Sequence, residues 1–134
     1  MNVVVDTNVV VSSLLRNGKL RRVIARLLQA PLYDWVITEA IRKEYEEVIC
    51  RPRFRLPLDA IEAMFQVFDS LPLIDDSNIT AEFPRDPTDA KFVRCALASN
   101  ASYFITGDGD FRETPTIGNT IVISVSNFLG VLGI

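Results

Sequence analysis

The sequence predicts an α/β fold: a three-layer α/β/α sandwich with a central, mostly parallel sheet of four to five strands. Short β-branched or aromatic runs alternate along the chain with segments whose apolar residues recur every three or four positions. The first run, residues 2–5, ends in three valines, which is typical of a parallel strand buried on both faces. Such alternation places helices on both sides of a parallel sheet. We expect one domain over residues 1–134.

The first half of the chain continues from this strand with three helices and one more strand. The expected ranges are helices over 7–15, 19–28 and 39–49, and a strand over 33–37. In the second helix the apolar residues recur at spacings of three and four, which predicts one buried face. Thr38 is expected to cap the third helix, because a threonine hydroxyl accepts a hydrogen bond from a first-turn amide.

Prolines divide the second half of the chain. Pro52 follows Arg51 and ends the preceding helix, and Pro57, at a first-turn position, opens the next one. The expected ranges are helices over 57–69, 86–99 and 126–132, and strands over 71–74, 103–106 and 121–124. Strands from both halves of the chain are therefore expected to share one sheet.

The composition excludes several classes of protein. The net charge of −3 argues against binding of nucleic acid by bulk positive charge. The chain has no histidine, which excludes a Ser-His-Asp triad, a histidine-based ribonuclease mechanism and any histidine-ligated metal. The two cysteines, Cys50 and Cys95, are too few for a disulfide framework, and Cys95 is expected to be buried. No secretory or membrane-spanning segment is expected, which predicts a cytoplasmic protein.

Positive charge is concentrated in residues 1–55, which carry ten lysines and arginines against six acids, whereas residues 56–134 carry four against eleven. The basic residues form either a solvated helical surface or a rim that contacts phosphates. The candidates for contact with an RNA backbone are Arg42, Lys43, Arg51 and Arg53. The aromatic residues that either stack on bases or fill the core are Tyr33, Trp35, Tyr45 and Phe54.

Carboxylates occur where two of the expected parallel strands end. Asp6 directly follows the strand over 2–5, and Asp108 and Asp110 follow the strand over 103–106. Ligands of open α/β sheets bind at the carboxyl ends of the strands. These acids are therefore expected to meet if the two strands are neighbours.

Two further acids extend this group. Asp89 opens the helix that leads into the strand over 103–106, and Glu44 lies on the helix that follows the strand over 33–37. Two like charges about 4 Å apart repel by roughly 4 kcal/mol at an effective dielectric near 20, so such a cluster needs cations. A ligand set of oxygens alone suits Mg²⁺ or Mn²⁺, provided that the acids meet.

Each acid also has a simpler interpretation. Asp6 is placed to cap the following helix, Asp89 to act as a first-turn acid, and Glu44 to be a solvated helix residue. Residues 107–110 have the composition of a turn, and Asp86, which is followed by a proline, caps a helix or braces the site. The order and positions of the acids, taken together, indicate one shared site more strongly than any single acid does.

The sequence resembles PIN-domain nucleases over nearly its whole length. The segments that carry the resemblance are 3–8, 43–48, 85–89 and 106–111, in this order. The chain most resembles the compact PIN domains that are toxin components of type II, VapC-like toxin–antitoxin systems. The resemblance implies a PIN-like, Rossmann-like sandwich.

By this resemblance, the catalytic acids would be Asp6, Glu44, Asp89, Asp108 and Asp110, of which Asp6, Asp89 and Asp108 would bind Mg²⁺ or Mn²⁺. The residues that would orient carboxylates or water are Thr7, Asn8, Thr106 and Asp86. The implied reaction is metal-dependent hydrolysis of an RNA phosphodiester to a 5′-phosphate and a 3′-hydroxyl. The implied partners are a second copy of the chain, in a homodimer, and an antitoxin that covers the acidic groove.

Three other functions remain open. Many PIN domains act in RNA processing and are not toxins. A phosphatase of the haloacid-dehalogenase type also has an aspartate after its first strand, but it needs a second aspartate two residues later, where this chain has Asn8. A non-catalytic module that binds RNA or protein would be expected to have lost some of the acids.

Overall fold

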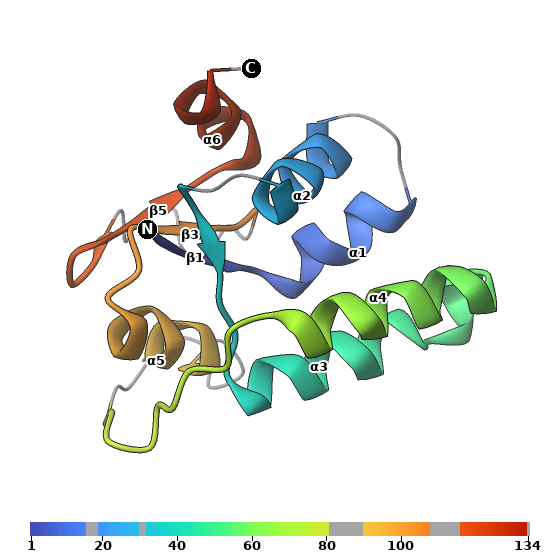
Figure 1. Ribbon diagram of the computed structural model, residues 1–134, viewed down its shortest axis with the longest axis horizontal. Coiled ribbons are helices and arrows are strands. Elements are labelled where there is room, and N and C mark those ends of the chain that lie inside the picture. Colours follow the sequence, from blue (N-terminus) through green and yellow to red (C-terminus); the bar gives the residue numbers. More distant parts are fainter. Residues whose placement is uncertain (16–18, 30–31, 81–89, 108–115, 134) are drawn as a thin grey trace.

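The computed structural model describes residues 1–15, 19–29, 32–80, 90–107 and 116–133, which form an α/β fold around one sheet (Figure 1). The strands are β1 (Asn2–Val5), β2 (Asp34–Trp35), β3 (Tyr103–Ile105), β4 (Thr116–Ile117) and β5 (Thr120–Ile123). The helices are α1 (Thr7–Leu15), α2 (Lys19–Gln29), α3 (Glu39–Ile49), α4 (Leu58–Ser70), α5 (Ala90–Ser99) and α6 (Val125–Leu132), with a 3₁₀ turn, η1 (Pro52–Phe54), after α3. The predicted fold class is confirmed.

The five strands follow the order β2-β1-β3-β5-β4, and all neighbouring strands are parallel except β4 and β5. Strands β1 and β3 lie side by side, with Val5 opposite Ile105. Both strands therefore end at the same edge of the sheet. The residues that follow them, Asp6 and Thr106, become neighbours although they are far apart in the sequence.

Helices cover the two faces of the sheet. In Figure 1, α2 and α6 lie above the strands and α5 lies below them. Helix α5 packs against β1, β3 and β4, whereas α2 packs against β2 and α6. Phe92 of α5 stacks on Phe104 of β3 with ring centroids 5.5 Å apart, and both side chains are buried. Burial of such a side chain contributes roughly 1.5–3 kcal/mol, so this contact fixes α5 on the sheet.

Helix α3 follows the sequence prediction closely. The Thr38 hydroxyl oxygen accepts a hydrogen bond from the backbone N–H of Ile41 at 3.3 Å, so the predicted cap is present. Ile41 and Tyr45, one turn apart, are both fully buried. This face of the helix is held against the core, and it leaves the adjacent Glu44 near the end of β1.

The two cysteines differ in environment, as the sequence predicts for Cys95. Cys95 lies in α5 and is fully buried, and burial raises the pKa of its thiol to about 12. Cys50, at the end of α3, is exposed. Cys95 is therefore a core residue.

The predicted strand over 71–74 is wrong. Only one parallel bridge forms there, between Ile37 and Leu73, and β2 is shorter than the predicted range of 33–37. The Ile37 N–H donates to the Pro72 carbonyl at 3.1 Å, and the Ile74 N–H donates to the Ile37 carbonyl at 2.7 Å. Pro72 has no N–H to add to the ladder, which limits the pairing to this short stretch.

A short hairpin near the carboxyl end of the chain was absent from the sequence prediction. Strand β4 pairs antiparallel with β5, and the turn between them holds Gly118 at a φ of 58°. A Cβ atom at Gly118 would lie 3.1 Å from Cδ2 of Leu97 on α5. Glycine is therefore favoured at this position by the positive φ and by the close approach of the Leu97 side chain.

Helix boundaries agree with the prediction to within a few residues. Pro57 precedes the first helical residue of α4 instead of occupying it. The predicted helix over 86–99 is described from Ala90 onward, and its first four residues lie outside the described ranges. None of the helices in the described ranges has the length and apolarity that crossing a membrane requires.

Candidate active site

Asp6 lies at the carboxyl end of β1 and is 4% exposed. Its backbone N–H donates to the Ile105 carbonyl at 2.9 Å, which extends the pairing of β1 with β3 by one residue. Its carboxylate accepts a hydrogen bond from the Thr106 hydroxyl at 2.6 Å, and the Asn8 N–H lies 3.3 Å from the other carboxylate oxygen. Asp6 therefore both caps α1 and presents a fixed carboxylate at the edge of the sheet.

Two consecutive residues of α3 hold the two neighbours of Asp6. Glu44 accepts a hydrogen bond from the Thr7 hydroxyl, and the Tyr45 hydroxyl donates to the Val5 carbonyl. Tyr45 is fully buried, which raises its pKa well above the ordinary value, so its hydroxyl remains a donor. The chain is thus anchored to α3 immediately before and immediately after Asp6.

Glu44 also joins α3 to α5. The Lys91 ammonium lies 2.6 Å from Oε1 of Glu44, while Thr7 binds Oε2. The two side chains are only 24% and 23% exposed. The interpretation of Glu44 as a solvated helix residue is therefore wrong: it lies between the first turns of α1 and α5, beside the turn that carries Asp6.

The donor set of this edge fits a hard divalent cation. Asp6 and Glu44 supply carboxylate oxygens, and Thr7 and Thr106 supply hydroxyls bonded to them. Oxygen ligands of this kind suit Mg²⁺ or Mn²⁺ and not soft metals. Glu44 is already paired with the Lys91 ammonium, so it is assigned here as a residue that positions its neighbours.

The other predicted acids lie outside the described ranges. These are Asp86, Asp89, Asp108 and Asp110. In the sequence, Asp89 immediately precedes α5, and Asp108 comes two residues after Thr106. Within the residues described, no three acids or cysteines come together as a metal-binding group. The convergence of all the predicted acids remains a prediction.

The basic candidates for RNA contact lie in α3, in η1 and in the link between them, and most of them already contact another side chain. Arg42 pairs with Glu39 at 2.8 Å, and Arg51 pairs with Glu47 at 2.9 Å. The Arg53 guanidinium lies 4.8 Å from the centre of the Phe54 ring. The Arg51–Glu47 pair is exposed, and exposed ion pairs are weak, so Arg51 is able to exchange partners.

Lys43 is exposed on α3. Of the aromatic candidates, three are buried in the core and one is half-buried on η1. The buried residues are Tyr33, Trp35 and Tyr45, and the half-buried residue is Phe54. Phe54 packs against the core but stays partly exposed, so it alone of these four aromatic candidates is not fully buried.

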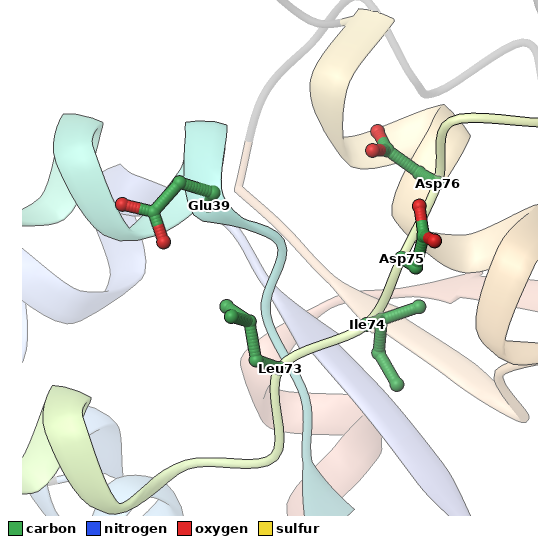
Figure 2. Close-up of a pocket in the computed structure, with 5 residues that line it drawn as sticks. All are labelled: Glu39, Leu73, Ile74, Asp75 and Asp76. Carbon is green, nitrogen blue, oxygen red and sulfur yellow. The ribbon is translucent and has the colours of Figure 1, made fainter.

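A separate acidic pocket of about 270 Å³ lies beside the start of α3 (Figure 2). Its lining consists of Glu39, Leu73, Ile74, Asp75 and Asp76. Figure 2 shows the Glu39 carboxylate pointing away from the two aspartates. Asp76 instead pairs with Arg94 of α5 at 3.1 Å. The acids of this pocket therefore do not converge on one point.

The sequence matches the PIN domain family over residues 2–110, and the chain belongs to this family. PIN domains are a class of nucleases, and this membership separates the chain from the phosphatases of the haloacid-dehalogenase type. A chain in the crystal structure of VapBC2 from Rickettsia felis, bound to a DNA fragment from the promoter, has the same fold. The TM-score is 0.59 at 15% identity, covering 92% of this chain and 98% of that chain. No curated protein matches the chain.

Proposed function

We propose that this protein is a metal-dependent endoribonuclease, consisting of one PIN domain, and that it is the toxin of a toxin–antitoxin pair. The observation that carries the proposal is the buried carboxylate of Asp6 at the junction of β1 and β3, fixed by Thr106 and flanked by two anchors on α3. A buried carboxylate is costly unless hydrogen bonds compensate its burial, and Thr106 and Asn8 supply them to Asp6. Membership of the PIN-domain family supports the same conclusion.

In this proposal, Asp6, Asp89 and Asp108 hold one or two ions of Mg²⁺ or Mn²⁺, with Asp110 as an additional acid. When bound, the ion supplies stabilisation of the negative charge that develops on the phosphate. Thr106 keeps the Asp6 carboxylate in one orientation, through its 2.6 Å hydrogen bond. The resulting hydrolysis adds water across an RNA phosphodiester and leaves a 5′-phosphate and a 3′-hydroxyl.

Other residues of the chain position Asp6 and contact the RNA backbone in this proposal. Glu44 and Tyr45 fix the turn on either side of Asp6, so the carboxylate does not have to reorient when substrate binds. Lys43 and Arg53 are exposed on α3 and η1, and in this proposal they contact the RNA backbone. No imidazole is needed as acid or base, in keeping with a chain that has no histidine.

The toxin assignment is supported by the fold shared with a chain of VapBC2 from Rickettsia felis. We infer by analogy that a small antitoxin protein binds this chain over the acidic edge, and that the nuclease acts as a homodimer in the cytoplasm. The second candidate, a PIN nuclease of RNA processing, shares the same site and differs in its partner. A neighbouring gene for a small protein that blocks cleavage would distinguish the two.

Single-stranded RNA should be cut in the presence of Mg²⁺ or Mn²⁺ and left intact when EDTA replaces the metal, because the acidic edge cannot stabilise a developing phosphate charge alone. The measurement is gel analysis of labelled RNA, with 5′-phosphate detected by a phosphate-dependent exonuclease. Re-addition of metal to the chelated sample serves as the control. Cleavage that continues in EDTA, or products with a 2′,3′-cyclic phosphate, would contradict the proposal.

A further inference from the structure

We propose that Lys91 is a built-in counter-cation of this site: it holds Glu44 in the metal-free protein and weakens the binding of the divalent cation. This inference rests on the proposed metal-dependent function. It assigns Lys91 as a positioning residue, which acts through its contact with Glu44.

The contacts around Glu44 place this cation inside the acidic edge. The Lys91 ammonium lies 2.6 Å from Oε1 of Glu44, and the other oxygen of Glu44 accepts from Thr7, the residue next to Asp6. A continuous path of contacts therefore joins the ammonium to the turn that carries Asp6. Lys91 and Glu44 are 24% and 23% exposed, so solvent screens this pair less than a surface pair.

The neighbouring basic residues do not have this placement. Arg94, one turn further along α5, binds both the carboxylate and the backbone carbonyl of Asp76. Lys43, adjacent to Glu44 in the sequence, is exposed to solvent. Among the residues described, Lys91 is thus the basic residue that contacts Glu44.

A fixed ammonium at this position has two opposite effects. It reduces the mutual repulsion of the acids when no metal is bound, which stabilises the folded protein. It also repels an incoming divalent cation, which lowers metal affinity. A residue with only a structural role would, on removal, weaken the fold and metal binding together. Removal of Lys91 is instead expected to weaken the fold and to strengthen metal binding.

Calorimetric titration with Mn²⁺ and thermal melting of the metal-free protein test whether Lys91 has these two opposite effects. Lys91→Met is expected to bind Mn²⁺ about fivefold more tightly than the parent, while its metal-free form melts at a lower temperature. Lys91→Gln retains a hydrogen-bond donor for Glu44 without the charge, so it is expected to show the same tightening with a smaller loss of thermal stability. Lys91→Arg keeps the charge and is expected to restore the parent's affinity and melting temperature.

Arg22→Met is the control, because it removes the same charge from an exposed position on α2, outside the contacts assigned to the site. Its Mn²⁺ affinity should stay within about twofold of the parent's, since exposed charges are well screened. Unchanged or weaker binding by both Lys91→Met and Lys91→Gln, with a parent that binds Mn²⁺, would overturn the role of Lys91 alone. A parent that neither binds Mn²⁺ nor cleaves RNA would overturn the proposed function and this inference together.

Discussion

Asp6→Asn should lose nearly all RNA cleavage while keeping its fold. The substitution preserves an oxygen that can accept from Thr106, so the hydrogen bond seen at 2.6 Å has a replacement acceptor. It removes the negative charge that a divalent cation requires. Loss of a residue that hydrogen-bonds to a metal ligand already lowers metal affinity or activity by about 10- to 100-fold. Asp6 is the proposed ligand itself, so we expect kcat to fall by about 10³-fold or more. Cleavage rates at saturating Mg²⁺, with a circular dichroism melt of each protein, provide the measurement.

Asp34→Asn is the matched control for this variant. Asp34 is an exposed aspartate on β2, and the change removes the same charge from the amino end of the sheet. Its cleavage rate should remain within about twofold of the parent's, because surface charges far from a site are screened. Equal rates for Asp6→Asn and the parent would refute the assignment of Asp6 as a catalytic residue.

Tyr45→Phe should weaken both the fold and the catalytic site. The Tyr45 hydroxyl donates to the Val5 carbonyl and lies 3.4 Å from the indole nitrogen of Trp35, which donates to it. Removing the hydroxyl leaves the carbonyl before Asp6 buried and unpartnered, which costs about 1–3 kcal/mol in the free energy of unfolding. The freed carbonyl also loosens the position of Asp6, and we expect kcat to fall by about 10-fold or more.

Tyr33→Phe separates these effects from the simple loss of a tyrosine hydroxyl. Tyr33 packs edge-on against Phe128 at the amino end of the sheet, far from the end where Asp6 lies. Its kcat should match that of the parent, measured at the same temperature and metal concentration. A Tyr45→Phe enzyme with full kcat in its folded fraction would show that the Val5 contact does not position Asp6.

Much of the fold follows from local patterns in the sequence. The valines of β1, the helical periodicity of α2 and the Thr38 cap are each encoded by a few adjacent residues, and each is present. The segment over 71–74 has a strand's composition, but pairing depends on the partner strand and on Pro72, which a local pattern does not weigh. The β4–β5 hairpin is only two residues long on one side, too short for an alternating pattern to appear.

The sequence predicts where Asp6 lies, at the end of its strand, but not the contacts that hold it. Asp6 was placed by the end of its strand, since parallel neighbours end together. Tyr45 was expected to be either a core residue or a base-stacking residue, and its bond to Val5 depends on the packing of α3 against β1. A signal was present: a tyrosine on the buried face of a helix needs a partner for its hydroxyl. The pairing of Lys91 with Glu44 spans 47 positions, beyond any local pattern.

The central claim is that distant acids share one divalent cation at the carboxyl end of β1 and β3. Anomalous diffraction from crystals of the protein grown with Mn²⁺ tests it most directly. A peak about 2.1 Å from the Asp6 carboxylate, with oxygens of Asp89 and Asp108 completing the ligand set, is the expected result. A peak at another surface, or an Asp6 carboxylate separated from both of the other aspartates in a metal-bound crystal, would contradict it.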